Sequence, residues 1–543
     1  MFLEARPTIH IDRVFVKPFV DRDQLEAEVT LRNDTARPAT VSLAGDVLSW
    51  TSQAGKDMLS APLPRGKLSG PSALKINAVT ATVPANGSTT VTLTERVTSR
   101  LKLWSPESPN LYGLVCRLKN ESAAVSDVKQ TRFGWRQVTF QGTKVLLNNR
   151  PLIIKGDSWH FMGIPQMTRR YAWAWYKTLR DANLNAVRLH AQPYPEFYLD
   201  MADEMGILVL DETAVWASDG GPKVDSSAFW RDTETHLQNL ILRDRNHPSV
   251  FGWSISNEMM AVVRGVFHAP QEQQDEVIRH YSVWADICRK ADPTRAWISA
   301  DGEDDGSGAL PTYVVHYGGT GALERAAKSG KPWGVGEAGP AYYGTPEQIA
   351  EMSGNGRSYL SFRDRMEGVA AVSYQSLMDQ RRLGASFRSV FNLVWYGLKP
   401  LELGMKDTTH PPALSDGITF PPFVEGKPGV QPERLGPYCT TLNPGYDPRL
   451  PLYSTWPLFT AIRDAHAEPN AIPYKPAPDS TLIAAAAKSP RSGTIKTVPV
   501  LSGPGGTLAR SLIDLGVTVV PENPRSSEGE KPELLFVDGA QPP

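Results

Sequence analysis

Apolar runs of strand length alternate with helix-like runs through the middle of this chain, between about residues 141 and 400. Segments such as RRYAWAWYKTLRDAN and QQDEVIRHYSVWADICRKA have the spacing of amphipathic helices. Eight apolar runs end near Gly156, His190, Glu212, Glu258, Asp301, Tyr317, Glu337 and Trp395. Eight strand–helix units in about 250 residues are typical of a closed barrel of parallel strands. We therefore predict an α/β chain with a (β/α)8 TIM barrel over residues 141–470.

The sequences before and after the predicted barrel show other patterns of apolar and polar residues. Residues 1–140 contain short alternating strands, among them QLEAEVTLRN and LYGLVCRL, separated by turn signals. This pattern predicts an immunoglobulin-like β-sandwich ahead of the barrel. Residues 471–543 contain TVPVLSGPGGTLARSLIDLGVTVV, which predicts the opening of a doubly wound α/β module too short to be complete. Both ends look abrupt, so we expect the chain to be part of a longer protein.

Composition excludes several classes of function. The formal net charge is −1, which gives no electrostatic reason for binding nucleic acid or a membrane surface. The 3 cysteines are far apart and predict neither a disulfide framework nor a zinc site. No signal peptide or membrane-spanning window is visible, so the localisation stays open. The 14 tryptophans often stand among polar residues, an arrangement that suits sugar rings.

Two carboxylates stand at the ends of predicted barrel strands. Residues Arg245–Met259 read RNHPSVFGWSISNEM, in which Glu258 follows a run that suits a buried strand. Glu337 ends KPWGVGE, 79 residues later, which corresponds to three barrel units further round. Both carboxylates then face the mouth of the barrel. Glycoside hydrolysis needs such a pair, with retention of configuration when they are about 5–5.5 Å apart.

The segment RNHPSVFGWSISNE resembles the acid/base segment of glycoside hydrolase family 2, the family of β-galactosidases, β-glucuronidases and β-mannosidases. The segments LWSPESPNLYGLVCRL, FGWR and NAVRLHAQPYPEFYLDMADEMGILVLDE are also similar to that family, so the resemblance covers roughly residues 10–400. It implies that Glu258 is the acid/base and Glu337 the nucleophile. It further implies that Asn257 binds the sugar 2-hydroxyl, Trp395 lies under the ring, Tyr317 hydrogen-bonds the nucleophile and Arg188 lies beneath it.

The chain departs from the family pattern in ways that bear on the sugar. We expect no jelly-roll domain ahead of the sandwich within this sequence, although the family normally has one; strand two continues RLHAQPYP, and strand three continues DETAVWAS. We find no good match to the Asn-x-Lys motif with which family glucuronidases hold a carboxylate, which disfavours a uronic acid.

Further side chains are expected at the mouth because they follow strand ends. We expect His160 and His190 to bind hydroxyls and Trp216 to wall the subsite, while His316 could point either way. Asp211 and Glu212 are expected to be structural partners of Arg188 or of nearby backbone.

These observations predict a retaining exo-β-glycosidase, with β-galactosides as the expected substrates. The same mechanism on β-mannosides, β-glucuronides or glucosaminides is one alternative. A non-catalytic carbohydrate-binding or scaffold protein on a TIM barrel is another. We expect a carbohydrate substrate, no cofactor and no metal, because strand one lacks the HxH of barrel metallohydrolases. A homo-oligomer stays open.

Overall fold

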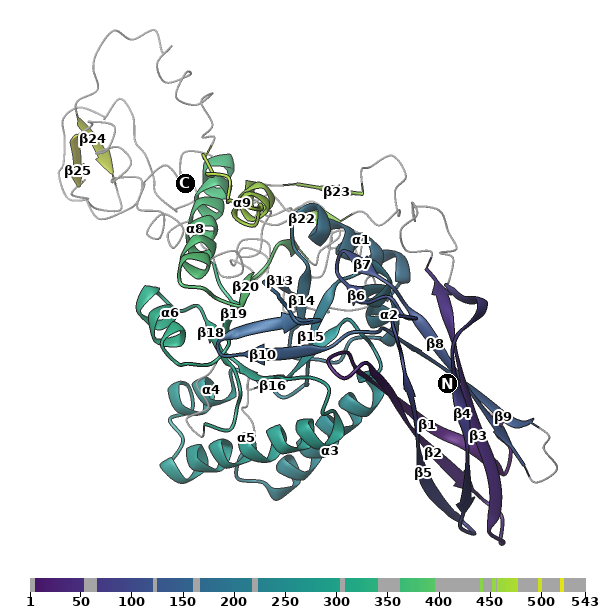
Figure 1. Ribbon diagram of the computed structural model, residues 1–543. Coiled ribbons are helices and arrows are strands. Elements are labelled where there is room, and N and C mark those ends of the chain that lie inside the picture. The colour runs from purple at the N-terminus through teal and green to yellow at the C-terminus, as the bar shows by residue number, and fades with distance from the viewer. Residues whose placement is uncertain are drawn as a thin grey trace, which may run out of the picture.

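The computed structural model describes most of the sandwich and barrel and short stretches beyond them. The described residues are 5–52, 66–120, 125–159, 167–216, 223–302, 308–339, 362–395, 440–442, 452–455, 457–476, 497–500 and 518–521. Figure 1 shows the sandwich as an elongated pair of sheets beside the barrel.

The N-terminal part is a sandwich of two antiparallel sheets. One sheet has the order β1 (Ile9–Phe19), β2 (Gln24–Asn33), β5 (Gly87–Arg96). The other has the order β4 (Lys67–Val83), β3 (Ala39–Thr51), β8 (Tyr112–Lys119), β9 (Val125–Phe133). Alternate residues of these strands form one apolar core, such as Leu25, Ala27, Val29 and Leu31 of β2. This arrangement confirms the predicted immunoglobulin-like sandwich.

Two sandwich strands, β4 and β9, were not predicted from the sequence. They are the outer strands of the four-stranded sheet, and most of their side chains are exposed or half-buried. The β4 sequence KLSGPSALKINAVTATV also includes glycine and proline, which are depleted in strands. An edge strand needs fewer apolar side chains, so its alternation is weak.

The barrel is an eight-stranded parallel sheet whose neighbours follow the order of the chain. Its strands are β13 (Ile154–Trp159), β14 (Ala186–Leu189), β15 (Leu208–Glu212), β16 (Val250–Asn257), β17 (Trp297–Asp301), β18 (Tyr313–His316), β19 (Trp333–Glu337) and β20 (Phe387–Val390). β13 pairs with both β14 and β20, so the first and last strands meet. β17 and β18 are in contact at the remaining seam. The predicted (β/α)8 barrel is therefore confirmed.

Helices cover the outside of the barrel. They are α1 (Arg169–Asp181), α2 (Glu196–Met205), α3 (Ser227–Asp244), α4 (Met259–Gly265), α5 (Gln271–Ala291), α6 (Thr320–Ala327), α8 (Phe362–Arg382) and α9 (Pro457–Ala465). In Figure 1, α3 and α5 lie side by side along one flank, and α8 packs against α9 on another. The apolar faces of most of these helices join the outer faces of the strands in one large core, and α6 packs in a smaller core with β18 and β19.

The amino ends of the barrel strands are closed by an apolar plug. Trp297 and Phe387 are the first residues of β17 and β20. Their rings pack edge to face, with centroids 6.2 Å apart. The hairpin of β10 (Val138–Gln141) and β11 (Lys144–Leu147) packs onto them, with the Phe140 ring 6.3 Å from that of Trp297. With this end filled, the carboxyl ends of the strands form the open mouth.

The eighth barrel strand does not lie where the sequence predicted it. The expected run, VFNLVW, is mostly beyond β20, and Trp395 belongs to β21 (Val394–Trp395), which pairs with β22 (Thr440–Leu442) outside the barrel sheet. The true strand reads FRSV and carries polar residues in its middle. The buried Ser389 hydroxyl lies 2.6 Å from the Val335 carbonyl oxygen, which satisfies it. This tertiary contact cannot be seen in a scan for apolar runs.

Beyond residue 476 the structure describes only β24 (Thr497–Val500) and β25 (Thr518–Pro521). They pair in parallel, and the α/β module over residues 471–543 stays a prediction. The predicted glycine-rich turn and helix lie outside the described residues.

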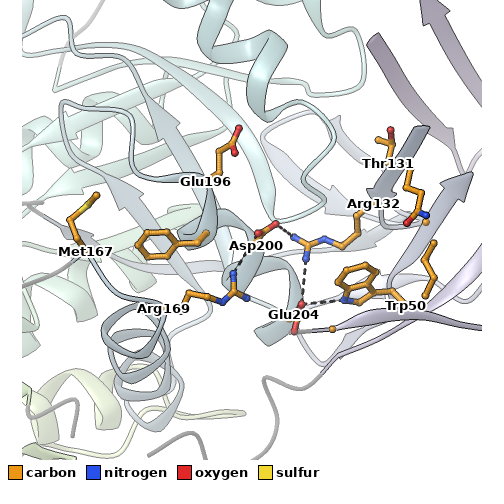
Figure 2. A pocket seen from close by; sticks show the side chains of 13 residues that line it. Trp50, Thr131, Arg132, Met167, Arg169, Glu196, Asp200 and Glu204 are labelled. Carbon is orange, nitrogen blue, oxygen red and sulfur yellow. Dashed lines mark hydrogen bonds and ion pairs between the residues drawn. The ribbon is translucent and has the colours of Figure 1, made fainter. Parts of the chain in front are cut away.

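Charged side chains join the sandwich to the barrel. The Arg132 guanidinium of β9 bonds Asp200 at 2.5 Å and Asp203 at 2.6 Å on α2. The Trp50 indole of β3 donates to Glu204 Oε1 at 3.1 Å. Figure 2 shows Arg132, Trp50, Asp200 and Glu204 along a cavity of about 710 Å³ between the two parts.

Candidate active site

Three barrel strands leave the sheet through residues with left-handed backbone. Ala191 (φ 50°), Glu258 (φ 47°) and Tyr317 (φ 46°) come just after β14, β16 and β18. Residues with a Cβ adopt this conformation rarely, and cases concentrate at functional sites. The turns bring Glu258 and Tyr317 to the mouth of the barrel.

Glu337, the last residue of β19, is a buried carboxylate surrounded by donors. Its Oε1 accepts from Arg188 Nη1 at 2.7 Å and lies 3.2 Å from His190 Nε2. Its Oε2 accepts from the Tyr317 hydroxyl at 2.7 Å. Burial would raise the pKa of Glu337, but the charge of His316, followed by the hydrogen bond and charge of His190 and the charge of Arg188, holds this pKa well below 4.5. Glu337 is therefore ionised at neutral pH.

Arg188 lies on β14 inside the barrel and is fully buried. It donates to both oxygens of Glu212, at 2.8 Å from Nε and 2.9 Å from Nη2. Its Nε also lies 3.5 Å from Asp301 Oδ1. Burial would lower the pKa of Arg188, but the charges of Glu212, Asp301 and Glu337 raise it. Arg188 is thus a permanent cation fixed below Glu337.

Glu258 has a more open environment than Glu337. Its side chain is 29% exposed, and its Oε1 lies 2.9 Å from His316 Nδ1. One carboxylate oxygen of Glu258, one of Glu337 and a ring nitrogen of His316 all lie within 4.8 Å of one another. The two carboxylates predicted to face each other across the mouth are therefore brought together, in unequal surroundings.

The same three groups are close enough to meet around a cation, so the charge of His316 matters. Burial would lower the pKa of His316, but the Glu337 charge, the nearby Asp301 carboxylate and the hydrogen bond to Glu258 raise it to about 9. The ring therefore carries its own proton at neutral pH and donates instead of offering a lone pair. A charged imidazole ring at this position offsets part of the negative charge of the two carboxylates.

Asn257 ends β16 and is fully buried. Its Oδ1 accepts a hydrogen bond from Arg188 Nη2. Its Nδ2 has no hydrogen-bond partner among the described residues. A buried donor without a partner is costly, so this amide is available to a ligand hydroxyl.

Two further predicted residues line the mouth, and two cannot be placed. The His190 ring lies edge-on to Trp216 at 5.6 Å, and Trp216 is 46% exposed. The backbone of Trp216 bridges to Asn257. His160 and the side chain of Trp395 lie outside the described residues.

The expectation for strand three holds for one residue and fails for the other. Glu212 faces into the barrel and binds Arg188, as expected. Asp211 faces the opposite side of β15, where its neighbour is Asp244 of α3. Successive strand residues point to opposite faces, so the two carboxylates could not both reach Arg188.

Sequence reasoning left the direction of His316 open and did not single out Asp301 as part of the site. A signal for His316 exists in the strand period, since Val314, two residues earlier, packs inside the barrel. His316 therefore shares the inner face of β18. Asp301 had no comparable signal, because its partners Arg188 and His316 come from other strands.

Comparison with known proteins decides the family. The family model described as "Glycosyl hydrolases family 2" matches residues 9–136. The model "Glycosyl hydrolases family 2, TIM barrel domain" matches residues 138–333, so the two cover more than half of the chain. The chain belongs to glycoside hydrolase family 2. Both models describe glycosyl hydrolases, and together they span the sandwich and most of the barrel.

The relatives of this family 2 chain are named as enzymes that act on different sugars. A β-glucuronidase candidate of Formosa agariphila is 36% identical over 167 residues, which are 29% of this chain and 16% of the relative. The β-galactosidase of Priestia megaterium is 25% identical over 275 residues, 48% of this chain and 25% of the relative. The chain thus matches a quarter or less of these relatives' length.

The fold of this hydrolase is shared by solved family 2 structures. A β-galacturonidase of Eisenbergiella tayi bound to galacturonate superposes with a TM-score of 0.57 at 16% identity, over 86% of this chain and 74% of that one. Bacteroides uniformis β-glucuronidase 2 superposes with a TM-score of 0.55 at 17% identity, over 72% of this chain and 47% of that one. Within the described part of the hydrolase, no helix is long and apolar enough to cross a membrane.

Proposed function

We propose that this glycoside hydrolase removes terminal β-linked sugars with retention of configuration. Glu337 attacks the anomeric carbon while Glu258 gives its proton to the departing glycosidic oxygen, so a glycosyl ester forms as the old bond breaks. Glu258 then takes a proton from water, whose oxygen attacks the anomeric carbon and releases Glu337.

The observation that supports this mechanism most is the separation of the two carboxylates. Oxygens of Glu258 and Glu337 lie within 4.8 Å of each other. An inverting enzyme needs a water between its carboxyl groups and separates them by about 6.5–9.5 Å. The unequal environments fit the two roles, because the nucleophile must be ionised and the acid must have access to the leaving group.

For the sugar, we propose a neutral β-glycoside, with β-galactosides as the first substrate. A uronic acid would need a cation for its carboxylate. The basic side chains near Glu337 in the described part of the chain, Arg188, His190 and His316, already face that carboxylate. β-Glucuronides are the second candidate, because the 36% identical relative carries the name of a β-glucuronidase.

A panel of p-nitrophenyl β-glycosides tests the proposal, with galactoside, glucuronide, galacturonide, mannoside and N-acetylglucosaminide compared by kcat/KM. Proton NMR of the first-formed sugar should show the β-anomer. Glu337→Gln should lower kcat at least about 1,000-fold, since it removes the nucleophile. Glu276→Gln, on the outer helix α5, is the matched control and should keep wild-type rates.

Several outcomes would overturn parts of the proposal. A first-formed α-anomer would exclude double displacement. Activity that survives Glu337→Gln would remove Glu337 from the reaction. Preference for glucuronide over galactoside would reject the neutral sugar while leaving the mechanism intact.

A further inference from the structure

The His316 ring occupies a slot that two glycines leave open. Its side chain is 3% exposed at the end of β18. A Cβ added at Gly302, which follows β17, would lie 2.7 Å from His316 Nδ1. A Cβ at Gly336 in β19 would overlap Nε2. The neighbouring strands thus accommodate an imidazole at this position and hold it in one orientation.

Charged groups from four strands face this ring. Nδ1 lies 2.9 Å from Glu258 Oε1 after β16 and 3.6 Å from Glu337 Oε1 of β19. Nε2 lies 3.9 Å from Asp301 Oδ1 of β17 and has no hydrogen-bond partner among the described residues. Arg188 of β14 opposes the protonation of His316, and the Tyr317 ring on its own strand is 6.2 Å away. Three carboxylates against one guanidinium favour a positively charged ring.

We propose that His316 is a positioning residue of the glycosidase site, which holds Glu258 through Nδ1–H and places a positive charge between Glu258 and Glu337. This inference rests on the proposed function and adds a role that the two-carboxylate mechanism does not require.

The geometry gives His316 a task in each half of the reaction. While Nδ1–H is bonded to Oε1 of Glu258, the acid proton of Glu258 resides on Oε2, the oxygen that is free to face the leaving group. When the glycosyl ester has formed, Glu337 has lost its charge. The imidazolium then stabilises Glu258 as the carboxylate that takes a proton from water.

Two substitutions separate the hydrogen bond from the charge. His316→Asn keeps a neutral N–H donor near the position of Nδ1, whereas His316→Val removes both donor and charge. Each is assayed on aryl glycosides of the sugar that the wild-type enzyme hydrolyses. 2,4-Dinitrophenolate leaves without a proton, whereas p-nitrophenolate and alkoxides need progressively more help from the acid.

For His316→Val we expect a loss of kcat that is about tenfold larger on alkyl glycosides than on dinitrophenyl glycosides, because general acid catalysis is impaired. His316→Asn should restore part of this difference. In both variants the acid limb of kcat/KM should move to higher pH, because Glu337 loses the positive charge that favours its ionised form.

A measurement on the wild-type protein covers the case in which a variant fails to fold. In protein labelled with 13C-histidine, one histidine should titrate near pH 9. Its midpoint should fall when a 2-deoxy-2-fluoroglycoside esterifies Glu337. The role is overturned if no histidine responds to the ester.

The role is also overturned if active wild-type enzyme and both folded variants share one pH profile and one leaving-group dependence. If the wild-type enzyme hydrolyses no β-glycoside at all, the proposed function itself fails, which is a separate result.

Discussion

At the scale of single residues, the site depends on an unequal treatment of two glutamates. Glu337 is enclosed and receives hydrogen bonds from Arg188 and Tyr317, while Glu258 stays partly exposed and meets His316. Hydrogen bonds to the ionised form stabilise a carboxylate, so the donors around Glu337 keep a charge buried that would otherwise be neutralised. The ionisation state of each glutamate therefore depends on the hydrogen-bond donors that neighbouring strands supply, and not on its strand-end position alone.

Tyr317→Phe tests how much one of these donors contributes to catalysis. The change removes the 2.7 Å hydrogen bond to Glu337 Oε2 and leaves the aromatic ring. A hydrogen bond to a charged group contributes about 1.5–3 kcal/mol, so kcat should fall by roughly 10- to 100-fold.

Tyr374→Phe is the matched control, because the Tyr374 hydroxyl donates to the Ile472 carbonyl oxygen and does not contact either glutamate. Steady-state kinetics of both variants check the prediction. Equal activity of Tyr317→Phe and wild type would show that this bond does not support the ionised nucleophile.

At the scale of elements, strand β15 carries two adjacent carboxylates with opposite surroundings. Glu212 faces Arg188 inside the barrel, whereas both oxygens of Asp211 lack a hydrogen-bond partner among the described residues. Burial, and then the nearby Asp244 carboxylate, raise the pKa of Asp211 well above 3.8. An unfolded chain releases this proton near pH 3.8, so the folded state is penalised as the pH rises from there to the higher folded pKa.

Asp211→Asn should therefore stabilise the protein at neutral pH. An amide cannot ionise and can donate to Asp244, which removes the penalty. A gain of about 1 kcal/mol corresponds to a Tm increase of roughly 2–4 °C in a large domain. The gain should disappear below pH 3.8, where the carboxyl of Asp211 is protonated in both states.

Differential scanning calorimetry at pH 7 and at lower pH checks this expectation. Asp232→Asn, at an exposed position of the neighbouring helix α3, is the control and should change Tm by less than about 2 °C. A lower Tm for Asp211→Asn at pH 7 would contradict the expected penalty.

At the scale of the whole molecule, the sandwich and the barrel are joined by buried charges. Asp203 of α2 is fully buried and accepts bonds from Arg132, His247 and the Ser249 amide. Burial would raise the pKa of Asp203, but the charges of His247 and Arg132 and the hydrogen bonds lower it to about 2. Its stabilising contribution is therefore fully present above pH 3.8 and is lost as the pH falls toward 2.

Arg132→Met should weaken this joint, because it leaves Asp203 and Glu204 with fewer partners. Removing one member of a buried ion pair costs about 3–5 kcal/mol, so Tm at pH 7 should fall markedly, and the two parts should unfold in separate calorimetric transitions. The deficit relative to wild type should shrink below pH 3.8.

Arg117→Met is the control, since Arg117 pairs with Asp46 within the sandwich and is 40% exposed. Its cost should be about 1 kcal/mol or less. If Arg117→Met lowered the free energy of unfolding as much as Arg132→Met, the ion pairs between sandwich and barrel would contribute no more than an exposed pair within the sandwich.

The sequence by itself determined the order of the parts and the positions of Glu258 and Glu337 at the ends of barrel strands. Apolar periodicity is a local property, so the parallel barrel, the inner sandwich strands and the strand-end positions of Glu258 and Glu337 could be predicted from neighbouring residues. Elements whose signal is weak locally were missed, namely the edge strands β4 and β9 and the polar strand β20.

Only the tertiary structure decided how the site is charged. His316, Asp301, Arg188 and Glu212 come from four different strands, and the closed barrel brings them onto the two glutamates. Closure also set which of two adjacent carboxylates, Asp211 or Glu212, meets a cation. Burial and distance control such electrostatics, and both depend on residues that are remote in the chain.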